Sequence, residues 1–295
     1  MTGSAARAPG NVRTASWSRV GSLAPSALSE AALELHCAVQ LIASAGRTFV
    51  EPRQDHSHMA MSWDQKRRSF VGAPFAGAYP FRVALRPADL TLQLLDRTDQ
   101  ALGSLPLAGH SRADAYDWLA LGLATYMGGP PPRLESPDYE LPTHPIAAGA
   151  PFSGGREEER GALAALYAGA AGLLAELTRG RSDASAVTCW PHHFDIATLI
   201  TMEPEAPDRP ARGVGVGMAP FGTGSDGWYW YVSPWPRPDA GALPPLEPPG
   251  AWHVDGWTGA MLRGDEVLAA AASRRRALVH DFIRRALDAS AGVVR

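Results

Sequence analysis

The sequence predicts an α+β protein in which two similar helix–strands–helix halves surround a mainly antiparallel sheet. Two stretches, 28–45 and 156–178, place apolar residues at helical spacing, and each is followed by several strand-like runs. A further helical stretch closes each half. The strands are clustered between helices without regular βαβ alternation, which favours α+β over a parallel doubly wound sheet.

The first half begins with the helix over 28–45, where Gly46 is a natural stop. The alternating segment 55–63 is then expected to be a strand. Runs 81–85 and 90–95 predict two more strands with a turn between them.

The first half closes with a helix. Ser111 and Asp114 form a capping-box-like start, and this helix is expected to run to Met127, where Gly128 and Gly129 follow. A proline-rich connection over 129–151 leads to the second half.

The second half repeats this order. The helix over 156–178 has acidic residues in its first turn, which suit the positive end of the helix dipole. The segment 186–202 is rich in β-branched and aromatic residues and is interpreted as strand. Segments 213–217 and 228–232 predict two further strands, and 265–287 predicts a closing helix.

These patterns suggest a flexible N-terminal arm over 1–24 and a single α+β unit over 25–295. Within that unit, the repeated order predicts two pseudo-repeats, 28–128 and 155–290. The chain has 295 residues, which suits one large domain or two of ordinary size.

Composition narrows the class of function. The formal net charge is −3 and no basic stripe exists, so nucleic acid is not an expected partner. The absence of a long apolar run argues against a membrane span, and the N-terminus does not resemble a signal peptide. Two cysteines cannot make a disulfide framework. We therefore expect a cytoplasmic protein, while its oligomeric state is not predicted.

The segment Trp190-Pro191-His192-His193-Phe194-Asp195 is the strongest candidate for chemistry. If it is a strand, His193 and Asp195 share one face and His192 points the other way. A carboxylate beside an imidazole can fix its tautomer and raise its basicity, as a general base requires. The alternatives are a metal-binding pair and a structural pair at a strand edge.

Two further polar pairs are expected near this segment. His56 and His58 would share one strand face, unless they form a solvated turn. His36 and Gln40 lie one helical turn apart on or beside an apolar face, where they must find partners or line a cavity. Both readings of His36 and Gln40, as a structural pair and as ligand contacts, stay open.

Aromatic residues crowd the C-terminal third, where they build a core or line an apolar pocket. Trp63, Trp190 and Trp230 are the candidate pocket walls. The alternating glycines from Gly213 to Gly217 are followed by Ala219-Pro220-Phe221 where a dinucleotide loop would need a helix. They are expected to permit the close approach of another backbone or a ligand instead.

The Trp190–Ala197 segment resembles a W-P-x-H-F-D-x-A pattern of uncharacterised bacterial proteins, and Tyr229–Trp235 resembles their Y-x-Y-V-x-P-W-like segment. These proteins look distantly similar to domain-of-unknown-function family 5996, whose L-H-x-x-x-Q helix matches Leu35, His36 and Gln40. That family has Gly-Ser where this chain has His192 and His193. The resemblance implies a fold and a set of residues, but no known activity.

The leading hypothesis is a small-molecule-binding protein, with the option of catalysis by His193 as base and Asp195 as the group that orients it. Its polar contacts would be His36, Gln40, His56, His58 and His192. The rivals are a non-catalytic structural or interaction protein and a metal-dependent hydrolase. No cofactor is indicated, and the spacing of ligands specifies no third partner for a metal.

Overall fold

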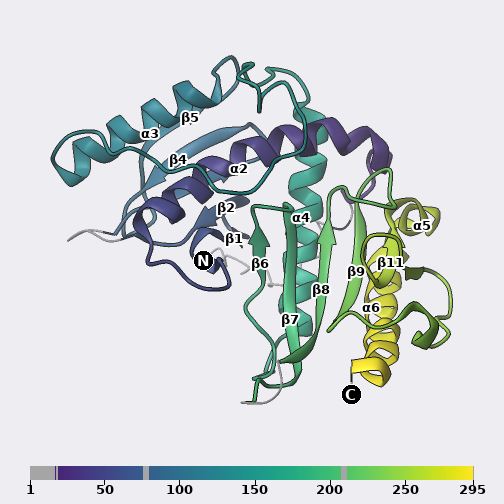
Figure 1. Cartoon of the computed structure of the whole chain (residues 1–295). Coiled ribbons are helices and arrows are strands. Elements are labelled where there is room, and N and C mark those ends of the chain that lie inside the picture. The colour runs from purple at the N-terminus through teal and green to yellow at the C-terminus, as the bar shows by residue number, and fades with distance from the viewer. Residues whose placement is uncertain (1–16, 18, 76–79, 207–210, 295) are drawn as a thin grey trace, which may run out of the picture.

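The computed structural model describes residues 17, 19–75, 80–206 and 211–294. In this part, the chain forms one sheet of eleven strands with helices packed against it (Figure 1). All neighbouring strands of the sheet pair antiparallel. The expected α+β class with a mainly antiparallel sheet is therefore confirmed.

The first group of strands follows chain order, as in a meander. Its strands are β1 (Met61–Asp64), β2 (Ser69–Gly72), β3 (Arg82–Arg86), β4 (Thr91–Leu95) and β5 (Ala101–Pro106). Short 3-10 turns, η1 (Pro25–Leu28) and η2 (Ser57–Met59), flank helix α2 (Ser29–Phe49), and helix α3 (Arg112–Met127) closes the group.

The second group continues the sheet in the order β6-β7-β8-β9-β11-β10. Its strands are β6 (Thr188–Trp190), β7 (Asp195–Glu203), β8 (Arg212–Ala219), β9 (Tyr229–Trp235), β10 (Ala251–His253) and β11 (Gly259–Arg263). Helix α4 (Glu157–Leu177) precedes them, η3 (Ala240–Ala242) lies before β10, and helices α5 (Gly264–Ala269) and α6 (Ala272–Val294) follow.

The two groups join where β1 pairs with β6, through the Cα partners Met61 and Cys189. Each group thus follows one helix (α2 or α4) and ends in another. This is the order expected for the two halves, and their structural similarity stays a prediction. Of the expected N-terminal arm, residues 1–16 and 18 lie outside the described part, whereas the side chains of Trp17 and Val20 are buried in the core.

The core lies on the helix-covered face of the sheet. Phe70 of β2, Ile196 of β7 and Trp230 of β9 belong to one buried cluster with residues of the helices. Side chains alternate along a strand, so their neighbours face the other way. On that second face, Ser62 is exposed and Leu199 is 46% exposed. This second face, here named the open face, also carries two small buried clusters, around Val71 and around Tyr229.

Two expected element boundaries are wrong. Gly46 does not stop the first helix, which continues to Phe49. It lies where the helix crosses the segment before β1, and a Cβ on Gly46 would come within 2.4 Å of the His58 carbonyl oxygen. The expected closing helix over 265–287 is divided into α5 and α6 at Ala270, whose backbone is extended at φ −79° and ψ 149°.

Candidate functional site

The two adjacent histidines lie on a turn, not on a strand. β6 ends at Trp190, β7 begins at its partner Asp195, and residues 191–194, here named the histidine turn, connect them. Pro191 has no backbone N–H to give to a ladder. Phe194 adopts φ 54°, a left-handed conformation, while its N–H donates to the Trp190 carbonyl at 2.8 Å. The interpretation of 186–202 as one continuous run of strand is therefore wrong.

Three buried side chains from the helices hold this turn. His36 Nε2 lies 2.8 Å from the Pro191 carbonyl oxygen, and Gln40 Nε2 donates to the same oxygen at 2.9 Å. Tyr167 of α4 donates its hydroxyl hydrogen to the Phe194 carbonyl. His36 also stacks on the Phe194 ring, with 5.7 Å between ring centroids. His36 and Gln40 thus help to fix the turn.

The protonation state of His36 follows from these contacts. A carbonyl oxygen can only accept, so Nε2 carries the hydrogen. Burial lowers the pKa of His36 to about 4, against the opposing effect of the Pro191 hydrogen bond. The ring is therefore neutral at pH 7, and its Nδ1 is a buried acceptor with no donor in the described part of the chain.

The turn presents His192 and His193 at its exposed tip. The His192 ring lies 4.3 Å from that of His193, 6.1 Å from Trp190 and 6.0 Å from Tyr139, measured between centroids. Partial burial of the His192 ring against these neighbours lowers its pKa to about 4, and the charges of His193, His36 and His56 act in the same direction. His192 is therefore neutral at pH 7.

The hydrogen-bond partner of Asp195 is Tyr231, and not His193 as expected. Asp195 is the first residue of β7 and lies on the open face of the sheet, opposite Trp190 in the pairing register. The Tyr231 hydroxyl of β9 donates to Asp195 Oδ2 across strand β8. Gly217 of β8 makes this possible, because a Cβ there would approach the Tyr231 hydroxyl oxygen to 2.5 Å. The group that approaches Gly217 is thus a tyrosine side chain, whereas the glycines were expected to admit another backbone or a ligand; a backbone does approach at Gly213, where a Cβ would come within 2.7 Å of the Ile200 carbonyl oxygen.

Asp195 is buried to all but 8% of its surface, and its Oδ1 has no hydrogen-bond partner among the residues that the structure describes. Burial raises the pKa of the Asp195 carboxyl, while the Tyr231 hydrogen bond and the charge of His193 oppose that rise. His193 was expected to act as the base and Asp195 to orient it from the same strand face. In the structure the two do not share a strand face, and they interact through their charges without a hydrogen bond.

The second histidine pair also departs from expectation. His56 is exposed in a left-handed conformation with φ 58°, and His58 belongs to η2, so the two do not share a strand face. His58 Nδ1 accepts a hydrogen bond from the Arg53 backbone N–H at 3.1 Å. His58 therefore stabilises its own loop, while His56 contributes to the electrostatic environment of His192.

Two of the candidate tryptophans lie in the core. Trp63 packs edge-on against Phe70, with centroids 5.0 Å apart, and Trp230 is fully buried and stacks on Trp17 at 6.4 Å. Trp190 differs, because it faces the open side of the sheet. Of the expected aromatic walls, Trp190 is the one beside the histidine turn.

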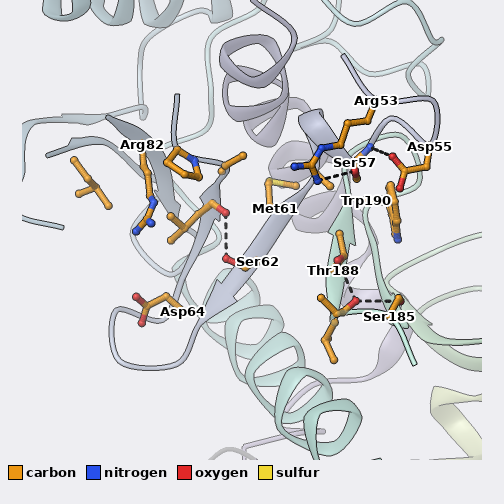
Figure 2. Close-up of a pocket in the computed structure, with 18 of the residues that line it drawn as sticks. Arg53, Asp55, Ser57, Met61, Ser62, Asp64, Arg82, Ser185, Thr188 and Trp190 are labelled. Carbon is orange, nitrogen blue, oxygen red and sulfur yellow. Dashed lines mark hydrogen bonds between the residues drawn. The ribbon is translucent and has the colours of Figure 1, made fainter. Parts of the chain in front are cut away.

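A groove of about 530 Å³ crosses the open face where β1 and β6 meet (Figure 2). Arg53, Asp55, Ser57 and Trp190 line one end, and Arg82 and Asp64 lie towards the other. The strands contribute Met61, Ser62, Val71 and Thr188, among others. The groove thus unites the 55–63 segment with Trp190, two regions that the sequence analysis singled out separately.

Several residues at this site were missed by sequence reasoning. Tyr139 lies in the proline-rich connection and donates to Gln40 Oε1 at 2.7 Å, and Tyr167 holds the histidine turn from α4. No local pattern marks either residue. Tyr231 could have been found, because strand alternation places it on the face of the glycines in β8. No local sequence pattern marks Arg53 as a residue that lines the groove.

Within residues 17–294 as described, no group of three or more His, Cys, Asp or Glu side chains is arranged to hold a metal ion. None of the helices described is long and apolar enough to cross a membrane. In the comparisons with known proteins, no family model, no curated protein and no solved structure matches this chain.

Proposed function

We propose that this chain binds a small organic molecule in the groove between the two strand groups. The observation that carries the proposal is the make-up of the groove. Its volume of about 530 Å³ is ample for a small ligand, since such sites typically measure about 300–1,000 Å³. Val71, Pro74 and Ala186 line it with apolar groups, and charged side chains from separate loops stand at its ends.

The end of the groove beside the histidine turn suggests the character of the ligand. Trp190 offers an aromatic ring to a planar group. The Arg53 guanidinium makes one side-chain hydrogen bond among the described residues, a long one of 3.4 Å to Ser57 Oγ, so most of its donors are free. A ligand with a planar ring and a negatively charged group would use both features.

Ligand-observed NMR with nucleoside monophosphates and aromatic carboxylates tests this proposal. Ser62→Trp should abolish the binding of any probe that the wild type binds, because Ser62 is exposed on β1 and an indole there fills the groove. Ser104→Trp is the matched control, since Ser104 is an exposed strand serine on β5. The proposal fails if no probe binds, or if both variants bind like the wild type.

Acid–base catalysis by His193 is the second candidate, favoured by the buried, partly unpaired carboxylate of Asp195 close to this exposed histidine. His193→Ala should abolish binding or turnover of a bound probe and change the midpoint of thermal unfolding little, because the side chain is exposed. His36→Ala is the comparison that should lower the midpoint, since His36 is 1% exposed. A purely structural role of His193 predicts the reverse: lower stability with unchanged binding.

A further inference from the structure

A second cavity of about 370 Å³ lies on the helical side of the molecule, where α2 and α3 meet the proline-rich connection. Gln40, Arg112, Ser136, Tyr139 and Glu140 contribute to its lining. It is distinct from the groove on the open face of the sheet, with which it shares no lining residue.

The connection that forms one wall of this cavity is tied firmly to α2. The Glu135 backbone N–H donates to Thr48 Oγ1 at 2.8 Å, and Arg47 pairs with the Asp138 carboxylate at 2.9 Å. Tyr139 donates to Gln40 Oε1, and Gln40 is itself 1% exposed. The cavity is therefore walled by side chains with fixed partners and not by a loosely attached loop.

Arg112 is the exception among these side chains. Its Nε is buried without a protein acceptor, and no hydrogen bond or ion pair joins its guanidinium to any described residue. The guanidinium lies over the ring of Tyr116, 6.0 Å from its carbon to the ring centroid. A guanidinium has only donors and is always charged, so a half-buried one without an acceptor requires an explanation.

The Asp114 carboxylate, in the same first turn of α3, does not supply the missing acceptor. It accepts hydrogen bonds from the Ser111 backbone N–H and hydroxyl in the capping box of the helix. The carboxylates of the connection do not supply it either. Glu135 and Asp138 pair with Arg47, and Glu140 lines the same cavity but lies beyond ion-pair distance of Arg112. The donors of Arg112 thus remain directed at a cavity and not at a protein group.

We infer that this cavity binds the anionic group of a small molecule, a carboxylate or a phosphate, through the Arg112 guanidinium. Arginine recognises both groups through parallel hydrogen bonds. The exposed Ser136 hydroxyl provides a further donor on the same wall. The Glu140 carboxylate disfavours ligands with several negative charges, such as polyphosphates, because like charges repel in a confined space.

Calorimetric titration with inorganic phosphate and, separately, with acetate tests the inference and distinguishes the two anions. The wild type should show saturable binding of at least one of them. Arg112→Met keeps the unbranched apolar stem of the side chain and removes the guanidinium with its charge, and should weaken this binding at least about tenfold. Arg133→Met is the matched control, because Arg133 is an exposed arginine of the same connection outside the cavity lining. It should bind like the wild type.

Circular dichroism and thermal unfolding establish that each variant is folded. Arg112→Lys provides a second variant, which keeps the charge but loses the planar fork, and it should fall between the wild type and Arg112→Met. The inference is overturned if neither anion binds the wild type saturably at millimolar concentration. It is overturned equally if Arg133→Met weakens binding as much as Arg112→Met, since the attraction is then general electrostatics.

Discussion

At the residue scale, Asp195 shows how a contact between strands replaces the local pairing that the sequence suggested. His193 and Asp195 are two positions apart, so an uninterrupted strand would place them on one face. The turn at Pro191 and Phe194 breaks that alternation, and Tyr231, distant in sequence, becomes the hydrogen-bond partner. The Asp195–Tyr231 pair depends on the arrangement of β7, β8 and β9 in the sheet, which the sequence alone does not give. The glycines of β8 indicated only that some group packs closely against that strand.

The buried carboxyl of Asp195 predicts a pH-dependent stability. Because burial raises its pKa in the folded state, the folded protein binds more protons than the unfolded chain between the two pKa values. The free energy of unfolding contributed by this group therefore falls as pH rises from about 4, the unfolded value, through the raised folded pKa. Asp195→Asn keeps an acceptor for Tyr231 and removes the charge, so its stability relative to the wild type should increase over that window.

Chemical denaturation of both proteins at a series of pH values between about 4 and 8, which begins at the unfolded pKa, measures the difference. Asp183→Asn is the control. The hydrogen bond and charge of the Arg181 guanidinium lower the pKa of the Asp183 carboxyl. That carboxyl therefore titrates below about pH 4, and the stability difference between Asp183→Asn and the wild type should stay constant over the same series. A constant difference between Asp195→Asn and wild type across the series would contradict the buried-carboxyl account.

At the scale of elements, local signals predicted the helices better than the turns. The capping box at Ser111 and the acidic first turn of α4 are local features, and both helices are present close to the expected bounds. The histidine turn was missed because its conformation depends on distant side chains. His36, Gln40 and Tyr167 are buried and form hydrogen bonds with the carbonyl groups of the turn. The residues of 186–202 by themselves do not indicate which distant side chains these partners are.

The role of Tyr167 in holding the histidine turn gives a prediction at this scale. Tyr167→Phe removes the hydrogen-bond donor of the Phe194 carbonyl while preserving the fully buried ring. A buried acceptor left without a partner costs about 1–3 kcal/mol, and we expect the free energy of unfolding to fall by that amount. Urea denaturation measures it.

Tyr126→Phe is the matched control for that measurement. The Tyr126 hydroxyl also donates to a carbonyl, that of Leu102 at 3.1 Å, but the side chain is 45% exposed. Water can replace the lost donor there, so the change should stay within about 0.5 kcal/mol. Equal losses in the two variants would mean that Tyr167 has no special role in the turn.

At the scale of the whole molecule, the main structural question is how two strand groups with such a narrow junction behave as one unit. The strands meet at the partners Met61 and Cys189 alone. The helices strengthen the junction. Glu34 of α2 and Arg160 of α4 form an ion pair at 2.9 Å with both side chains 2% exposed, and Tyr167 contacts the Phe70 ring of the first group as well as the histidine turn of the second. The proposed ligand groove lies across this same junction.

We therefore predict that the two groups unfold together. Leu92 of β4 is fully buried in the first group, and Leu92→Ala should cost about 2–5 kcal/mol. If unfolding is cooperative, amide protons of β8 in the second group lose as much protection in native-state hydrogen exchange as those of β3, because both exchange through the same global opening. Leu199→Ala, on an exposed position of β7, should leave both unchanged. If β8 kept its protection in Leu92→Ala while β3 lost it, the groups would be separate cooperative units, and the groove would lie between parts free to move against each other.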